Sequence, residues 1–340
     1  MNKYFELTDQ QKRDVITQTA NKIGLPVQAV EKDLWVTVIL QIIFSLPFAN
    51  KIVFKGGTSL SKVWNLIQRF SEDIDIAIDR SLFGLEGDLT KKQVKRLRKE
   101  ASLYVRNTIC QSLKDEIVKL EIGKSCEVEA ELDGEGDNTY PEPRKIHIRY
   151  NSLFDEKKSY LNQEVLLEVG SRSLIEPTET SKVKSLITTH FPINTNIIDS
   201  NITTTVPQKT FLEKAFLIHE LFSTGEGGVA NRKSRHLYDL EKMMDEDFAR
   251  KAIIDDELWN NIHHHRVIFT HMKNVNYTPD IRDRICLVPP EKIIDEWRRD
   301  YEAMQSTMIY GESLDFNKLI ERIYTLEKIF QNRSTKLLYE

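Results

Sequence analysis

The sequence has little cysteine, with three residues in 340 (Cys110, Cys126 and Cys286) and no CxxC pair. Because these cysteines are odd in number and far apart, we expect neither a disulfide framework nor a zinc site. No apolar run approaches the roughly 20 residues that a membrane span requires. The N-terminal sequence MNKYFELTDQQKRD is polar and contains acids, unlike a signal or transit peptide. We therefore expect a cytoplasmic protein with no membrane partner.

The sequence also has no excess of charge of one sign, because 48 Lys and Arg stand against 52 Asp and Glu, a formal net charge of −4. This balance argues against a protein that coats nucleic acid non-specifically, and it leaves room for a local basic groove. Hydrophobic residues at 40% and charged residues at 29% are typical of a globular chain. A length of 340 residues suits two domains of ordinary size.

The first half of the chain alternates between helical and strand patterns, and the second half is helical. Apolar periodicity predicts helices within 8–50 and 89–120, and short apolar or alternating runs predict strands at 51–54, 72–78, 126–132, 145–150 and 164–169. After Pro207 the pattern is helical to the end of the chain. We therefore predict an α+β fold, with a mixed sheet flanked by helices over 1–205 and an all-helical C-terminal domain over 206–340.

A glycine pair separates the first predicted strand from the start of a helix. Gly56 and Gly57 follow the strand directly, and the hydroxyl residues Thr58 and Ser59 come next. Two glycines let the backbone approach a triphosphate closely, and a helix N-terminus presents free N–H groups to its charge. The hydroxyl of Thr58 or Ser59 can add a contact to a phosphate oxygen. This segment is predicted to hold phosphates.

Two aspartates occupy alternate positions of the next predicted strand, where Asp73 and Asp75 interrupt a run of isoleucines. Their side chains leave one face of the strand about 6–7 Å apart. At an effective dielectric constant near 20, such a pair repels by about 2–3 kcal/mol. A divalent cation removes this repulsion, and Mg²⁺ prefers carboxylate oxygens. A two-metal arrangement needs a third acid on a neighbouring strand, and Glu168 fits because it alternates with Leu167 and Val169. These three acids are predicted to hold Mg²⁺, with Mn²⁺ as an alternative ion.

Each of these motifs also has a purely structural interpretation. Gly-Gly turns are common in proteins, and a DxD pair can lie on a solvated edge strand. The order of strand, glycine pair, helix and DxD strand, with a third acid further along, favours catalysis.

Six blocks of the sequence together carry a resemblance to a known family. The blocks are EKDLWV at 31–36, FKGGTSLSK at 54–62, RFSEDID at 69–75, LEKA at 212–215, RHLYDL at 235–240 and DYEAM at 300–304. They resemble the AbiEii/AbiGii toxin family of nucleotidyltransferases, a branch of the DNA polymerase β-type superfamily that includes the mycobacterial MenT toxins. The first blocks are shared with many members of that superfamily, and the later ones point to the toxin family.

The resemblance implies a nucleotidyltransferase-like fold, an NTP as donor and magnesium as cofactor. Toxins of this family are reported to modify RNA, including the 3′ ends of tRNA, or to act on the partner antitoxin. We therefore expect a magnesium-dependent enzyme that transfers NMP from an NTP to an RNA acceptor, such as a tRNA 3′ end. It would act as the toxin of a toxin–antitoxin or phage-defence system, with a cognate antitoxin as its protein partner. The alternatives are a small-molecule or protein acceptor, and a non-catalytic domain that binds RNA or a partner protein.

Together, the residue patterns and the matching motif positions define the expected site. The expected catalytic residues are Asp73, Asp75, Glu168, Lys214 and Asp239. The expected nucleotide-binding residues are Lys55, Gly56, Gly57, Thr58, Ser59, Arg69, Ser71, Lys214 and Arg235.

Lys214 also stands out from its own helical pattern. The residues three, four and seven positions after it are apolar, so the lysine would emerge from a face suited to packing. A buried ammonium needs an anionic partner, which a triphosphate or Asp239 would provide. The alternative is a lysine at a domain rim whose ammonium reaches water. For Asp239, the alternative is a helix-borne acid that pairs with Arg235, four residues earlier.

Two basic segments are candidates for contact with a nucleic acid. Lysines and arginines crowd the segment 91–99, for which a solvated helix face is the default interpretation and RNA backbone contact is the alternative. The segment 231–236 is similarly basic and lies close to Asp239 in the sequence. We favour this second segment as a contact for the nucleotide or the acceptor.

Overall fold

The computed structural model describes residues 4–71, 73–135, 139–154, 162–191, 193–223, 230–270, 272 and 274–332. The chain forms two compact units. The first unit comprises Met1–Val63 and Phe70–Thr205, and the second comprises Trp64–Arg69 and Val206–Glu340. The second unit therefore includes a short segment from the first half of the sequence.

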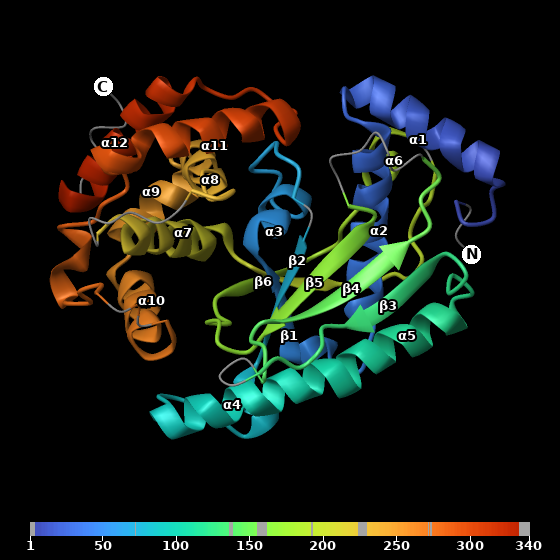
Figure 1. Ribbon diagram of the computed structural model, residues 1–340, viewed down its shortest axis with the longest axis horizontal. Helices are drawn as coiled ribbons and strands as arrows, with labels where there is room; N and C mark the ends of the chain where they lie inside the picture. Colours follow the sequence, from blue (N-terminus) through green and yellow to red (C-terminus); the bar gives the residue numbers. More distant parts are fainter. Residues whose placement is uncertain are drawn as a thin grey trace. The chain divides into compact units, whose positions relative to one another are not determined.

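A seven-stranded mixed sheet forms the centre of the first unit (Figure 1). Its strands are β1 (Ile52–Lys55), β2 (Asp73–Ile78), β3 (Cys126–Ala130), β4 (Arg144–Tyr150), β5 (Glu164–Gly170), β6 (Thr178–Ser181) and β7 (Ile202–Thr205). They lie in the order β3-β4-β5-β2-β1-β7-β6. The β2–β5 and β1–β7 pairs are parallel, and the other neighbours are antiparallel. The predicted mixed sheet is confirmed.

Six helices accompany this sheet in the described part of the first unit. They are α1 (Asp9–Ile23), α2 (Val27–Ile43), α3 (Gly56–Lys62), α4 (Lys91–Tyr104), α5 (Cys110–Lys119) and α6 (Leu186–His190). Helices α2 and α5 pack against the sheet and against each other, and α1 and α6 pack against α2 (Figure 1). Helix α2 is buried on all sides from Ala29 to Ile43. The charged residues near its start therefore need partners within the protein.

Strand β2 separates apolar from acidic side chains, as its alternation predicts. Ile74, Ile76 and Ile78 are fully buried in the core, whereas Asp73 and Asp75 lie half-exposed on the other face. Burial of each isoleucine contributes about 1.5–3 kcal/mol. A slip of one residue in the register would exchange the two faces, so the isoleucines fix the direction in which both aspartates point.

The basic segment 91–99 forms the start of a long helical stretch. Thr90 and Gln93 build a capping box at its N-terminus. Helix α4 continues through a single π-helical segment, Val105–Ile109, into α5. Leu97 is buried, while most lysines of the segment are exposed, so the helix predicted here is confirmed.

The second unit is helical, as predicted. Its helices are α7 (Pro207–Phe222), α8 (Arg235–Met243), α9 (Asp247–Ile254), α10 (Asp256–Phe269), α11 (Ile294–Thr307) and α12 (Phe316–Asn332). Helix α7 packs against α8, α9 and α10, and Phe211 of α7 stacks on Phe330 of α12. Pro207 occupies the first turn of α7, where its missing N–H breaks no helical hydrogen bond. None of the described helices is both long and apolar enough to cross a membrane.

Candidate functional site

In the first unit, the glycine turn lies directly against the aspartate strand. Gly56 has a left-handed backbone with φ +79°, and a Cβ at this position would lie 2.1 Å from Oδ2 of Asp75. Strand β1 is antiparallel to β2, with Lys55 opposite Asp75. A side chain at position 56 would therefore collide with a predicted metal ligand, and only glycine fits.

The two hydroxyl residues after the glycines hold the turn to its surroundings. The Thr58 hydroxyl donates to Oγ of Ser71 at 2.8 Å, and it also contacts the carbonyl oxygen of Asp73. The Ser59 hydroxyl donates to the carbonyl oxygen of Gly56 at 2.8 Å. Thr58 and Ser59 are both buried. In this structure Thr58 links the turn to the start of β2, and Ser59 closes the turn on itself. Direct contact of either hydroxyl with a phosphate stays a prediction.

Four charged side chains form a row across four neighbouring strands, with two adjacent carboxylates flanked by a lysine on each side. Lys55 lies opposite Asp75, Asp75 opposite Glu168, and Glu168 opposite Lys145. Residues in register leave the same face of a sheet, so these four side chains share one face. The Lys145 ammonium lies 3.4 Å from the Glu168 carboxylate. The predicted third acid is thus beside Asp75, and a lysine neutralises part of its charge.

The metal-binding capacity of this face rests on its carboxylates. Asp73 lies two residues from Asp75 on the same face of β2, where both are half-exposed. Carboxylate oxygens suit Mg²⁺ or Mn²⁺, which complete their coordination with water and substrate phosphates. Within the described ranges, no three His, Cys, Asp or Glu side chains are close enough together to enclose a metal ion by themselves. The donor set fits an ion that the aspartates and the substrate would hold jointly.

In the second unit, a buried ion-pair cluster gathers three residues that the sequence singled out. The Asp239 carboxylate accepts from Arg69 at 2.7 and 2.8 Å, and the Lys214 ammonium lies 2.8 Å from its Oδ2. Arg69 and Asp239 are at most 2% exposed, and Lys214 is 7% exposed. Lys214 is therefore no rim lysine that reaches water. Among the described residues, Asp239 pairs with Arg69 and Lys214 rather than with Arg235.

Among the described members of this cluster, two cations, Arg69 and Lys214, face one carboxylate, Asp239. Burial would raise the pKa of Asp239, but Arg69 and Lys214 hold that pKa well below its usual range. Burial lowers the pKa of Lys214, and the nearby charges of Arg69 and Arg235 act in the same direction against the attraction of Asp239. Cations of this kind are suited to a phosphate.

His236 is a further member of this cluster, which the sequence analysis considered only as part of the basic segment 231–236. Its Nδ1 lies 3.3 Å from the Lys214 ammonium. Burial and the neighbouring cations lower the pKa of His236 well below 6.5, so the ring is neutral and can accept a hydrogen bond from the ammonium. One indication of this position was present in the sequence: His236 is three residues before Asp239, a spacing that places both side chains on one side of a helix.

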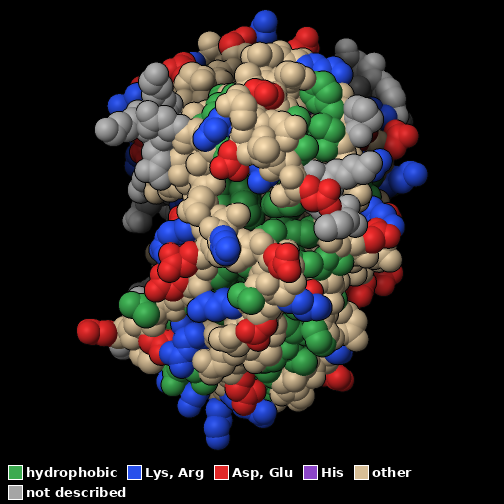
Figure 2. Space-filling view, turned by 90° about the vertical axis from the view of Figure 1, so that its right-hand side faces the viewer, with side chains coloured by type: hydrophobic (Ala, Val, Ile, Leu, Met, Phe, Trp, Pro, Cys, Tyr) green, Lys and Arg blue, Asp and Glu red, His purple; other side chains and the backbone are tan. Residues whose placement is uncertain are grey.

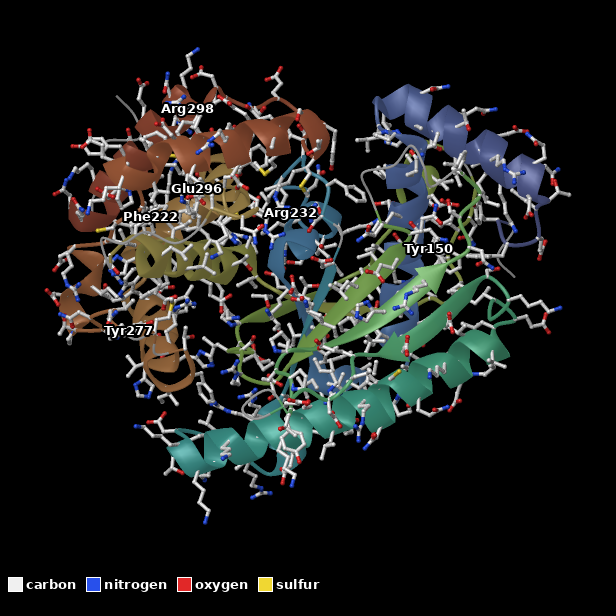
Figure 3. The ribbon with its side chains drawn as sticks, viewed as in Figure 1. Tyr150, Phe222, Arg232, Tyr277, Glu296 and Arg298 are labelled. Carbon is white, nitrogen blue, oxygen red and sulfur yellow. The ribbon has the colours of Figure 1, made fainter. Side chains whose placement is uncertain are left out.

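The loop before α8 is fixed by acids from α11. The backbone N–H of Ala230 donates to Glu296 at 2.8 Å, and the N–H of Arg232 donates to Asp300 at 2.6 Å. Figure 3 labels Arg232 and Glu296 in this part of the second unit. The Ser234 hydroxyl also donates to Asp300, at 2.5 Å. These contacts fix the start of the helix that carries Arg235, His236 and Asp239.

The first basic segment remains a candidate for contact with RNA. Lys91, Lys92 and Lys95 are exposed on α4, whereas Lys99 lies over the ring of Tyr140 at 5.5 Å from its centroid. On the face that Figure 2 presents, lysine and arginine side chains are most frequent in the lower half, where acidic side chains lie among them. Binding of a backbone phosphate needs clustered positive charge, and the exposed part of α4 provides it.

Comparison with known proteins identifies the family. The family model described as nucleotidyl transferase AbiEii toxin of a type IV toxin–antitoxin system matches residues 39–326. No curated protein matches the chain. Among solved structures, the nucleotidyltransferase toxin MenT4 from Mycobacterium tuberculosis H37Rv is similar, with 16% identity, 96% of this chain and 99% of that chain covered, and a TM-score of 0.49. Because the family model matches most of the sequence, the chain belongs to the AbiEii family of nucleotidyltransferase toxins.

Proposed function

We propose that this nucleotidyltransferase uses a divalent metal, preferably Mg²⁺, to transfer NMP from an NTP to an RNA acceptor. An acceptor hydroxyl would attack the α-phosphorus in line, and pyrophosphate would leave. The contact between Gly56 and Asp75 carries the proposal, because it joins the predicted phosphate turn to the predicted metal strand. A site of this kind supplies positioning and charge stabilisation, which account for most of the catalysis of phosphoryl transfer.

The residues of the first unit would hold the reacting groups. The backbone of Gly56 and Gly57 would bind the β- and γ-phosphates, since no side chain keeps the triphosphate away. Asp73 and Asp75 would hold the metal, which supplies charge neutralisation at the phosphates when it is bound. Glu168 would be the third acid and would help to activate the acceptor hydroxyl. Its half-exposed position beside Asp75 supports this role.

The cluster of the second unit would stabilise phosphate charge. Lys214 has the freedom to change partner, because Asp239 keeps its two hydrogen bonds from Arg69 when the lysine turns to an anion. Asp239 would then orient Arg69 and Lys214 rather than contact the substrate. Arg235, at the start of α8, would add a further contact to the nucleotide.

The acceptor is proposed from the distribution of exposed charge. RNA, such as a tRNA 3′ end, fits the exposed lysines of α4 and the basic segment that precedes α8. Modification of cellular RNA would account for toxicity, and a cognate antitoxin would act as the partner that relieves it. The family belongs to type IV toxin–antitoxin systems, which supports toxicity and the existence of an antitoxin.

The proposal is tested by offering every class of acceptor at once. Purified protein is incubated with each of the four α-labelled NTPs, Mg²⁺ or Mn²⁺, and total RNA, tRNA, an aminoglycoside or total protein. We expect the label to appear in RNA, only when metal is present, and not with the Asp75→Asn variant. If the label appears in the small molecule or in protein instead, that molecule and not RNA is the acceptor. Absence of pyrophosphate release with all NTPs and acceptors would overturn the proposed reaction.

A further inference from the structure

Asp33 and Lys62 are among the residues of the sequence blocks to which the proposed reaction gives no role. Lys62 is the last residue of α3, the seven-residue helix that begins at Gly56. Its ammonium forms an ion pair with the Asp33 carboxylate and donates to the Thr37 hydroxyl at 2.7 Å. It also donates to the carbonyl oxygens of Asp33 and Lys184, each at 3.3 Å. Every donor of this lysine is directed into the protein.

Asp33 continues the connection to a third helix. Its Oδ2 accepts a hydrogen bond of 2.7 Å from the backbone N–H of Leu186, the first residue of α6. The Asp33 and Lys62 side chains are only 10% and 8% exposed. This buried pair therefore ties together α2, α3 and α6. Asp33 also precedes residues 39–326, so the family match does not include it.

A buried ion pair of this kind is a weak source of stability. Desolvation of two charges offsets their attraction, and apolar residues of similar volume often stabilise a fold as well or better. Burial lowers the pKa of Lys62 while Asp33 raises it, which reflects these opposing effects. Such a pair instead fixes the orientation of the elements that it links, because each hydrogen bond has a preferred geometry. The orientation of α3 depends on such contacts, since a helix of two turns has little stability of its own.

We propose that Asp33 and Lys62 are positioning residues that fix α3 on α2 and thereby hold the Gly56 turn against Asp75. This inference rests on the proposed function of the Gly56 turn as the phosphate site. Lys62 fixes the C-terminal end of α3, while the Thr58 and Ser59 hydroxyls fix its first turn. The helix is thus held at both ends.

The chain offers a matched control in Glu31, which lies two residues before Asp33 on the same helix. Glu31 is also a buried carboxylate, and it accepts hydrogen bonds from the Ser152 hydroxyl at 2.5 Å and the Leu153 N–H at 2.8 Å. It therefore has a similar number of partners, but those partners lie after β4 and not at α3. A Glu31→Gln change perturbs the same helix and leaves the anchor of α3 intact.

The experiment compares Asp33→Asn, Lys62→Met, Lys62→Arg and Glu31→Gln in the full chain. Melting temperature, kcat and KM for the NTP, and amide hydrogen exchange of residues 57–63 are measured. Asp33→Asn and Lys62→Met are expected to lower kcat/KM by about 10–100-fold, the scale of a displacement near 1 Å, and to accelerate exchange in α3. Lys62→Arg, which keeps the charge, recovers part of both losses. Glu31→Gln is expected to change the melting temperature but neither kcat/KM nor hydrogen exchange in α3.

The outcomes separate this inference from the function on which it rests. If the wild type transfers NMP but Asp33→Asn behaves like Glu31→Gln in both exchange and kinetics, the positioning role is refuted. If the wild type transfers nothing, the proposed function fails, and faster exchange confined to α3 still supports the anchor. Should the Asn and Met variants not fold, Thr37→Val removes one hydrogen bond of Lys62 and is expected to show a smaller change in the same direction.

Discussion

A single methyl group at Gly56 is expected to impair catalysis far more than folding. In Gly56→Ala, the added Cβ would lie 2.1 Å from Oδ2 of Asp75, whereas ordinary contacts begin at 3.4 Å, so the carboxylate must retreat by about 1 Å. A displacement of that size at a reacting centre costs roughly 10²-fold in rate. The left-handed backbone adds a folding cost of about 1–2 kcal/mol.

Gly24→Ala separates these two effects. Gly24 has φ +72° at the C-terminal cap of α1, close to the φ of Gly56, and a Cβ there meets no atom within 4 Å. Both alanine variants therefore carry a similar backbone cost, which for a unit of this size lowers the melting temperature by roughly 2–8 °C. Only Gly56→Ala displaces the carboxylate.

The assay follows pyrophosphate release from an NTP with an RNA acceptor, together with thermal unfolding of both variants. We expect Gly24→Ala to keep the wild-type rate and Gly56→Ala to lose about two orders of magnitude. Equal rates for the two variants would show that the position of Asp75 does not matter to the reaction, and the argument from the Gly56 contact would fail.

Four further predictions address the metal, the lysine, the acceptor and pH. Asp73→Asn and Asp75→Asn should each abolish transfer without lowering the melting temperature, because a like-charge pair is relieved. Lys214→Met should fold and lose transfer by about 10²–10³-fold; a fully active Met variant would remove this lysine from the site. Transfer to RNA should weaken steeply with salt, and Lys95→Glu should reduce the steepness of that dependence; indifference to both would favour a small-molecule acceptor. Burial lowers the pKa of His219 to about 4, so as the pH drops below about 6.5 this histidine is protonated in the unfolded chain before it is protonated in the folded one. The free energy of unfolding should therefore fall by up to about 1.4 kcal/mol per pH unit. Urea unfolding at pH 7.5 and at pH 5 should show this fall, and His219→Gln should reduce it.

The sequence predicted those parts of the fold whose residues alternate in polarity. Strands β2 and β5 have isoleucine, valine or leucine at every second position, so the sequence predicted both the strands and the face of each that is buried. Strands β6 and β7 were missed because each has four residues and is rich in threonine, which leaves no apolar period to recognise. Helix α6 was missed for a similar reason, since its five residues are recognisable only by the Ser185 cap.

The site was predictable where its residues are neighbours in the sequence and obscure where they are not. The glycine turn and the DxD strand are 16 to 19 positions apart, and the chemistry predicted for them follows from local spacing. Arg69 and Asp239 are 170 positions apart, and no local pattern predicts that they form an ion pair. The sequence suggested Arg235 as the partner of Asp239 from helical spacing, but Arg69 occupies that role in the structure.

The charged groups described in each unit are what the proposed function requires. Around Asp75 on the sheet face, the three carboxylates of Asp73, Asp75 and Glu168 lie near the two ammonium groups of Lys55 and Lys145. In the cluster around Asp239, two cations stand against one carboxylate. The apolar core of the first unit includes the side chains on the other face of the sheet, so packing of that core does not explain these charges. Carboxylates attract a metal cation and basic groups attract phosphate, and a nucleotidyltransferase needs a group of each kind.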